Sequence, residues 1–405
     1  MIPQLVFDYS QLVPFFLVAL VIAAVSTPLI GRVAVRLGAL DLPGHLRSRL
    51  DRTAERRIHD RIVPKLGGLA TAVAIIATLL LTNSIGQLRW GIIAGIVLIT
   101  IIGVLDDIYN LSARVQLGGQ ALAGLFVVLS GITIASIQVA GVFINLNLYS
   151  TDIELGSFVY HLVFPGDLIT IMWVIGVINA INWVGGIDAL NGSLSSVASF
   201  TMLLIAMRTG NIPLAILIAV YLGSVLGVLP FNYNPAKIFF GTVGEFLNGF
   251  LLAVFAILGG SKLPLAIIIL GLPIIDAIWV VVLRIKSHPD ILKKPLKILT
   301  ISDKNHLHHR LLSLGYSQKS VLFIELAIMA ILCTIAFYFS GFRDEFVALV
   351  GAFAVIISVF AIIGVGRKQM QKAQAKQAEI KAKEPKVEIK IVNPNDKNDE
   401  EKYAY

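Results

Sequence analysis

The chain has 405 residues, of which 57% are hydrophobic and only 14% are charged, against roughly 25% charged residues in soluble domains. This composition excludes an ordinary soluble domain, and apolar runs of about 20 residues, each long enough to span a hydrocarbon core, recur along the sequence. The net charge of +8 would suit a nucleic acid, but the basic residues follow the loops between the apolar runs. We therefore expect a lipid bilayer, and no nucleic acid, as a partner.

The apolar runs predict an all-α polytopic membrane protein with about eleven transmembrane helices. The predicted spans are 11–35, 66–84, 90–106, 116–136, 168–184, 190–208, 212–230, 243–260, 263–284, 319–340 and 345–366. Residues 1–366 are therefore taken as one transmembrane domain. Residues 367–405 are basic and then of mixed charge, which predicts a disordered cytoplasmic tail.

The distribution of Lys and Arg predicts the orientation, because cytoplasmic loops carry an excess of these residues. The loop after the first predicted span is rich in Arg, and alternate later loops carry Arg114, Lys237 and Lys286. We therefore expect the N-terminus outside and the C-terminus in the cytoplasm. The outer loop 139–164 alternates apolar and polar residues, which predicts a short β-hairpin.

Four separated segments then place polar residues on the predicted cytoplasmic side. In the first, Asp106 and Asp107 end an apolar helix, where acids are poor partners for the negative end of the helix dipole. Two adjacent carboxylates are tolerated when a cation lies between them or water solvates both, and hard oxygen ligands favour Mg²⁺ bound partly through substrate phosphates. The alternative is that the two acids merely end the helix.

The second and third segments are an asparagine-rich turn and a lysine turn. The turn NAINWVGGIDALNG carries Asn182 and Asp188, and FNYNPAKIFFG carries Lys237 shortly before a helix. A lysine at that place suits phosphate capture, although it also agrees with the excess of positive charge in cytoplasmic loops. Inside the ninth predicted span, we expect Asp276 to hydrogen-bond within the helix bundle, with a catalytic role as the alternative.

The fourth segment is HLHHR, with His306, His308, His309 and Arg310. Clustered histidines are common zinc ligands, but no cysteine accompanies them, and the neighbouring basic residues would disfavour a cation. Contacts to a phosphate or a sugar are the better interpretation of this cluster.

In order and spacing, GVLDD, NAINWVGGIDAL, FNYNPAKIFFG and HLHHRLL resemble segments of the polyprenyl-phosphate N-acetylhexosamine-1-phosphate transferases. That superfamily includes the phospho-MurNAc-pentapeptide transferases. RRIHDRIVPKLGGLA is similar to the family's segment before the second span, and it brings in His59 and Lys65. The resemblance covers about residues 12–366, and the H-x-H-H-R form is similar to the branch that uses UDP-N-acetylglucosamine (UDP-GlcNAc) or a related UDP-sugar.

The resemblance implies transfer of N-acetylhexosamine-1-phosphate, with GlcNAc-1-phosphate the first choice, from a UDP-sugar to undecaprenyl phosphate or another polyprenyl phosphate. The reaction would release UMP at the cytoplasmic face and initiate the synthesis of a cell-wall or surface glycopolymer. The resemblance also implies a multi-pass protein of the bacterial inner (plasma) membrane, Mg²⁺ or alternatively Mn²⁺ as the cofactor, and mildly favours a homodimer.

Site residues are implied in the same way. Asp106, Asp107 and Asp188 would be catalytic, and Asp107 and Asp188 would hold the metal, with Glu245 as a further candidate. The residues that would contact the substrates are Asn182, Lys237, His306, His308, His309, Arg310, His59 and Lys65.

The chain departs from the family pattern at four positions. Gly185 and Thr242 stand where the family has aspartates, Glu245 where it has serine, and Gln116 where it has lysine. Glu245 could compensate for a missing acid one helical turn away, or only cap its helix. Two interpretations follow: an active transferase with a rearranged site, or a catalytically degenerate paralogue that acts as a binding or partner subunit in glycolipid assembly. A transporter is disfavoured, because the polar segments lie at one rim and not near the midplane.

Overall fold

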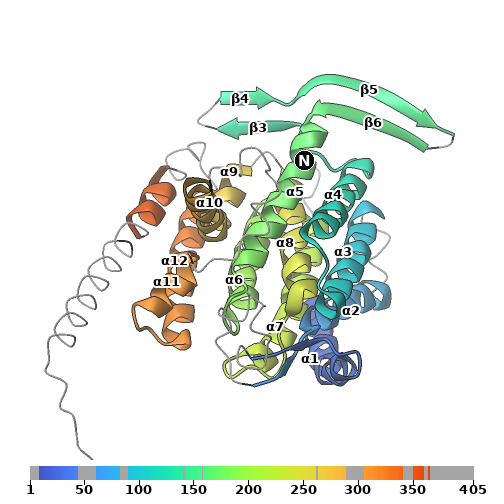
Figure 1. Ribbon diagram of the computed structural model, residues 1–405. Coiled ribbons are helices and arrows are strands. Elements are labelled where there is room, and N and C mark those ends of the chain that lie inside the picture. The colour runs from blue at the N-terminus through green and yellow to red at the C-terminus, as the bar shows by residue number, and fades with distance from the viewer. Residues whose placement is uncertain are drawn as a thin grey trace, which may run out of the picture.

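A computed structural model gives the fold, and it describes residues 9–43, 61–82, 90–139, 142–156, 158–260, 263–288, 305–340, 350–359 and 364. These residues form a bundle of long helices with antiparallel strand pairs projecting at one end (Figure 1). His59 and the tail 367–405 lie outside the described residues.

The described elements include twelve labelled α-helices and six strands. The helices are α1 Leu12–Arg36, α2 Gly67–Leu81, α3 Trp90–Tyr109, α4 Ala113–Leu129, α5 Gly166–Trp183, α6 Leu190–Arg208, α7 Ile212–Asn232, α8 Gly241–Leu258, α9 Leu263–Ile269, α10 Gly271–Ser287, α11 Leu307–Ser313 and α12 Gln318–Phe339. The strands are β1 Leu40–Asp41, β2 Val63–Pro64, β3 Ser136–Val139, β4 Val142–Asn145, β5 Asn147–Leu155 and β6 Phe158–Pro165. A short 3₁₀-helix, Tyr9–Gln11, precedes α1.

Within the described ranges, seven helices are long and apolar enough to cross a membrane, and the bent pair α9–α10 raises this number to eight. Helices α2 and α4 and the helix Val350–Val359 are apolar but shorter. The protein is therefore a polytopic helical membrane protein, and each predicted span overlaps one of these helices. The count of eleven spans and the inside–outside orientation stay predictions.

The predicted span 263–284 consists of two helices that meet at 77°. Pro273 has no backbone N–H to donate to the carbonyl of Ile269, which removes one bond of a continuous helix at this place. The chain accordingly breaks at Leu270, between α9 and α10. Proline is a common cause of such sharp bends.

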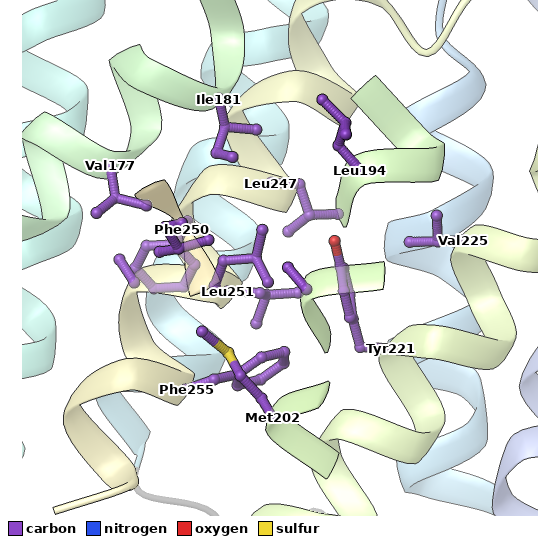
Figure 2. Close-up of a cluster of buried hydrophobic side chains, with 14 of the residues drawn as sticks. Val177, Ile181, Leu194, Met202, Tyr221, Val225, Leu247, Phe250, Leu251 and Phe255 are labelled. Carbon is purple, nitrogen blue, oxygen red and sulfur yellow. The ribbon is translucent and has the colours of Figure 1, made fainter. Parts of the chain in front are cut away.

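The hydrophobic core is densest where α5, α6, α7 and α8 meet (Figure 2). The side chains drawn there come from all four helices, and the labelled ones are Val177, Ile181, Leu194, Met202, Tyr221, Val225, Leu247, Phe250, Leu251 and Phe255. Helix α8 is apolar on nearly all sides and is buried along most of its length, as expected for a helix in the interior of a bundle. Its first turn is consequently fixed in the middle of one end of the bundle.

Glycines allow other helices to approach α8 closely. A Cβ added at Gly68 of α2 would overlap the backbone of Gly244, and one added at Gly103 of α3 would overlap Val243. Small residues at helix contacts of this kind let backbones pack side by side in membrane proteins. The first turn of α8 therefore touches the start of α2 and the last turns of α3.

Two antiparallel strand pairs, β3–β4 and β5–β6, lie where the sequence predicts a single short hairpin. The second pair leads directly into α5, and Asp167 in the first turn of α5 accepts hydrogen bonds from Val163 N (2.7 Å), the Tyr160 hydroxyl and the Thr133 hydroxyl (2.6 Å). This carboxylate anchors the strands to the bundle. Their location outside the membrane stays a prediction.

Candidate active site

The polar segments meet at the end of the bundle opposite to β5 and β6 (Figure 1). Helix α5 begins at the strands and has 18 residues, so at 1.5 Å per residue its far end lies about 27 Å away. At that far end the last turns of α3, α5 and α7 meet the first turns of α2, α6 and α8 through the contacts described below. The predicted placement of separate polar segments at a common end is therefore observed.

The segment between α7 and α8 lies at the centre of this end. Phe239 N donates to the carbonyl of Pro64, and the backbone N–H groups of Gly67 and Gly68 donate to the carbonyls of Phe239 and Phe240, each at 2.9 Å. The Asn232 side chain accepts from Ala189 N (3.1 Å) and donates to the Ile238 carbonyl (2.9 Å). One segment thus joins the start of α2, the turn after α5 and the start of α8.

Asp107 is buried and lies at the N-terminus of α8. Its two oxygens accept from the backbone N–H groups of Thr242 (3.0 Å) and Val243 (3.2 Å), and Lys65 Nζ lies 3.7 Å from Oδ1. A helix N-terminus favours a negative charge at this place. Gly241 has φ +69°, and a Cβ there would overlap the Asp107 carboxylate, so glycine allows the close approach. Asp107 is the anchoring anion of α8, and its roles as catalyst and metal ligand stay predictions.

Asp106 is half-buried and binds two of the residues that depart from the family pattern. Gln116 Nε2 donates to Oδ1 and Thr242 Oγ1 donates to Oδ2, each at 2.7 Å. Both donors are neutral. The carboxylate of Asp106 is therefore oriented by uncharged groups where the family pattern has a lysine and an aspartate.

Asp188 lies in the turn between α5 and α6 and faces the α7–α8 segment. Its Oδ2 accepts from Asn234 Nδ2 (2.9 Å) and from Ala236 N (3.0 Å). Lys237, the next residue, is exposed. Asn182, in the last turn of α5, is half-buried, and its carbonyl accepts from Gly185 N at 3.1 Å. The bond to Ala236 N thus brings the turn that carries Asp188 next to the segment that carries Lys237.

Two glycines admit side chains from other helices to this turn. A Cβ added at Gly185 would overlap the carboxylate of Glu245, and one added at Gly186 would overlap Nε2 of His308. Glu245 of α8 and His308 of the histidine helix α11 therefore both contact the backbone between Asn182 and Asp188. This contact connects the histidine cluster to the rest of the site.

His306 precedes α11 and is fixed by Asp276 of α10. Its Nδ1 lies 2.7 Å from Asp276 Oδ2, and Leu307 N donates to Asp276 Oδ1 at 2.9 Å. The prediction that Asp276 hydrogen-bonds within the bundle is confirmed. The His308 ring is parallel to the His306 ring, with centroids 5.8 Å apart, and the His309 ring lies 4.3 Å from that of His308.

Arg310 is buried and contacts protein groups. Its Nε donates to the Asn305 carbonyl at 2.7 Å, and its guanidinium lies 5.2 Å from the centroid of the Trp279 ring. His306 and Arg310 thus hold α11 in place, whereas His308 reaches the two-glycine turn. Substrate contacts by all four residues of HLHHR stay predictions.

Sequence reasoning missed the residues that hold these groups in position. Asn234 bridges Asp188 and Gln318, with the second bond at 3.1 Å. Arg284 lies over Trp183 at 4.9 Å from the ring centroid. The sequence does signal Asn234 and Trp183, because each lies inside a quoted motif within three positions of a predicted site residue, but it does not reveal their partners.

Oxygen ligands are present for Mg²⁺, which is usually bound by one or two carboxylates together with substrate phosphates. Across the part of the chain that the structure describes, no group of three or more His, Cys, Asp or Glu is arranged to hold a metal ion by itself. Asp188 lies in the turn after α5, and the carboxylate of Glu245 contacts the same turn at Gly185, three residues before Asp188. Two carboxylates fit a metal ion whose remaining ligands come from a bound phosphate and water.

Residues 89–260 match the model of a family described as glycosyl transferase family 4. The chain is 32% identical to a "probable undecaprenyl-phosphate N-acetylglucosaminyl 1-phosphate transferase" of Bacillus subtilis, over 78% of this chain and 82% of that protein. The chain belongs to glycosyl transferase family 4. The family resemblance predicted from the motifs is confirmed.

Two further relatives are similar to the chain over comparable lengths. The chain is 29% identical to the decaprenyl-phosphate N-acetylglucosaminephosphotransferase of Mycobacterium leprae, over 76% of this chain and 78% of that protein. It is 30% identical to the phospho-N-acetylmuramoyl-pentapeptide-transferase of Symbiobacterium thermophilum, over 71% of this chain and 87% of that protein. The similarity therefore extends well beyond the segment that the family model matches.

Proposed function

We propose that this family member transfers GlcNAc-1-phosphate from UDP-GlcNAc to undecaprenyl phosphate or a related polyprenyl phosphate, and releases UMP. The observation that carries the proposal is the gathering of Asp106, Asp107, Asp188 and His308 at one end of the bundle. Asp106 and Asp107 bind the first turn of α8, and Asp188 and His308 lie at the turn after α5. The names of the relatives support the same donor group and the same class of acceptor.

The position of the site suits a lipid acceptor and a soluble donor. Helix ends in a membrane bundle lie near the level of the lipid headgroups, where the phosphate of a polyprenyl phosphate would also lie. We place this end at the cytoplasmic face of a bacterial inner (plasma) membrane, because the loops there carry the excess of Lys and Arg. The product would start a cell-wall or surface glycopolymer.

In the reaction, an oxygen of the polyprenyl phosphate forms a bond to the phosphorus that carries the sugar. The bond from that phosphorus to the oxygen shared with the uridine phosphate breaks, and the electron pair leaves with UMP. Because both reactants are anions, positioning and charge neutralisation dominate such a reaction. We assign Lys65 and Lys237 to neutralise phosphate charge, and the half-buried Asp106 to orient or deprotonate the acceptor phosphate.

The donor side of the site is formed by the turn after α5. We assign Asn182, His308 and His309 to the sugar and the phosphates of the donor. Asp107 and Asp188 would hold Mg²⁺, or alternatively Mn²⁺, with the donor phosphates, and Glu245 is a further candidate ligand. When bound, the metal would neutralise the charge that develops on the departing UMP.

The test uses the purified full chain with UDP-GlcNAc, undecaprenyl phosphate and MgCl₂, and follows UMP and the lipid product. We expect release of UMP that depends on the lipid, and a loss of at least about 100-fold for Asp106→Asn. Asp152→Asn is the matched control, since Asp152 lies exposed on β5 and should leave the rate unchanged.

Equal background rates for the wild type and Asp106→Asn would contradict the proposal. They would favour the alternative of a degenerate paralogue that retains the fold and binds ligands for a partner.

A further inference from the structure

Gly185 and Glu245 are 60 positions apart in sequence and occupy the same space in the site. The carboxylate of Glu245 lies where a Cβ at position 185 would be. Gly185 is not among the residues with positive φ, so its backbone conformation does not require glycine. Glycine fits at position 185 because any Cβ there would overlap the Glu245 carboxylate from α8.

We propose that Glu245 is a substrate-site acid of this chain, and that Gly185 provides the space which admits its carboxylate to the donor turn. The inference rests on the proposed function. In this arrangement Glu245 and Asp188 together bind the divalent cation that accompanies the donor phosphates. The acid that the family pattern has on the turn itself is supplied here from the neighbouring helix.

A purely structural role at the start of α8 explains Glu245 less well. The first N–H groups of that helix, those of Thr242 and Val243, already donate to Asp107. Glu245 lies one turn later, half-buried, and its carboxylate is directed at the backbone of Gly185. Ionisable residues inside a membrane bundle are costly to bury and commonly mark functional sites.

The charges at the four departing positions balance in two pairs, one in direct contact and one joined through Asp106. Gly185 and Glu245 carry one acid between them, as do the aspartate and serine of the family pattern. Gln116 and Thr242 both bind Asp106 and are neutral together, as a lysine and an aspartate would be. In a site that had lost its function, nothing would favour the same net charge in each pair as in the family pattern. The unchanged net charges therefore support a rearranged and working site.

The experiment exchanges the position of the acid. Glu245→Ser removes it, Gly185→Asp places a second carboxylate against Glu245, and the double variant moves the single acid onto the turn. We expect UMP release to fall at least about 100-fold in each single variant and to recover to within about 10-fold of the wild type in the double variant. Glu245→Gln retains the size of the side chain and removes only its charge, and it should lose activity as Glu245→Ser does.

A second measurement does not depend on turnover. Binding of Mn²⁺ to the purified protein with UDP-GlcNAc, followed by electron paramagnetic resonance, should weaken at least about 10-fold in Glu245→Gln and recover in the double variant. Gly118→Ala is the matched glycine control, because a Cβ there meets nothing within 4 Å.

The proposal is overturned if Glu245→Gln binds Mn²⁺ and releases UMP as the wild type does. It is also overturned if a folded double variant is no better than both single variants. A wild type that releases no UMP would refute the proposed transfer, while a loss of Mn²⁺ binding in Glu245→Gln would still support the role of this acid.

Discussion

Replacing Thr242 with Asp would put a second negative charge beside Asp106. The Thr242 hydroxyl lies 2.7 Å from Asp106 Oδ2, so an aspartate there would hold two charges about 4 Å apart. At an effective dielectric constant of about 20, the repulsion between them is about 4 kcal/mol. Lysine at position 116 would counter it, because Gln116 Nε2 lies 2.7 Å from the other oxygen of Asp106.

The expected result is strong coupling between the two substitutions. Thr242→Asp alone should destabilise the protein by about 2–4 kcal/mol, and Gln116→Lys with Thr242→Asp should recover about 2 kcal/mol of that loss. The assay is reversible unfolding of the purified variants in one detergent, with UMP release measured on the same samples. Gln138→Asp, exposed on β3 in a strand pair (β3–β4) that contains no acidic residue, controls for an added negative charge away from Asp106.

Additivity would refute this reasoning. Gln116→Lys is also measured alone. If the loss of unfolding free energy in the double variant equals the sum of the losses in the two single variants, to within about 0.5 kcal/mol, the two positions do not share an electrostatic environment. The neutral pair on Asp106 would then be an unconnected difference from the family pattern.

Three further variants test individual contacts. Asp107→Ala leaves two N–H groups at the start of α8 without their acceptor and should lower the unfolding free energy by about 3 kcal/mol, whereas Asp107→Asn should lose less. Gly186→Ala would displace His308 and should raise the KM for UDP-GlcNAc at least about 10-fold, while Gly118→Ala leaves it unchanged. Asp276→Ala removes the acceptor of Leu307 N and should cost about 2 kcal/mol of stability, measured by unfolding.

Much of the fold follows from the apolar runs, because a helix that must cross about 30 Å of hydrocarbon needs a run of fixed length. The break at Leu270 does not follow in this way. Proline and glycine are tolerated inside membrane helices when neighbours satisfy the freed backbone groups, so Pro273 alone does not show where a helix will bend. Ser130 and Gly131 end α4 earlier than predicted, which leaves room for the strand pair β3–β4.

The site could be predicted as a set of segments, but not as a set of contacts. Counting helices places Asp106, Asp188 and His308 at one end of the bundle, because each lies in or beside a loop on the predicted cytoplasmic side. Which side chains touch depends on packing between helices far apart in sequence, and a single sequence carries no direct signal for it. The contact of Glu245 with Gly185 is of this kind.

The burial of α8 explains why changes at the site should come in pairs. Two of the four departures from the family pattern, Thr242 and Glu245, lie in α8. Of the other two, Gly185 meets Glu245, and Gln116 binds the same carboxylate as Thr242. A buried, closely packed helix start cannot shift outward to absorb a new charge. A change in that turn must therefore be matched by the residue it touches. In a decayed site, restoring aspartate at position 185 or 242 alone would improve the site, whereas in a rearranged site each single restoration should be worse than the present chain and only the paired exchange should be tolerated.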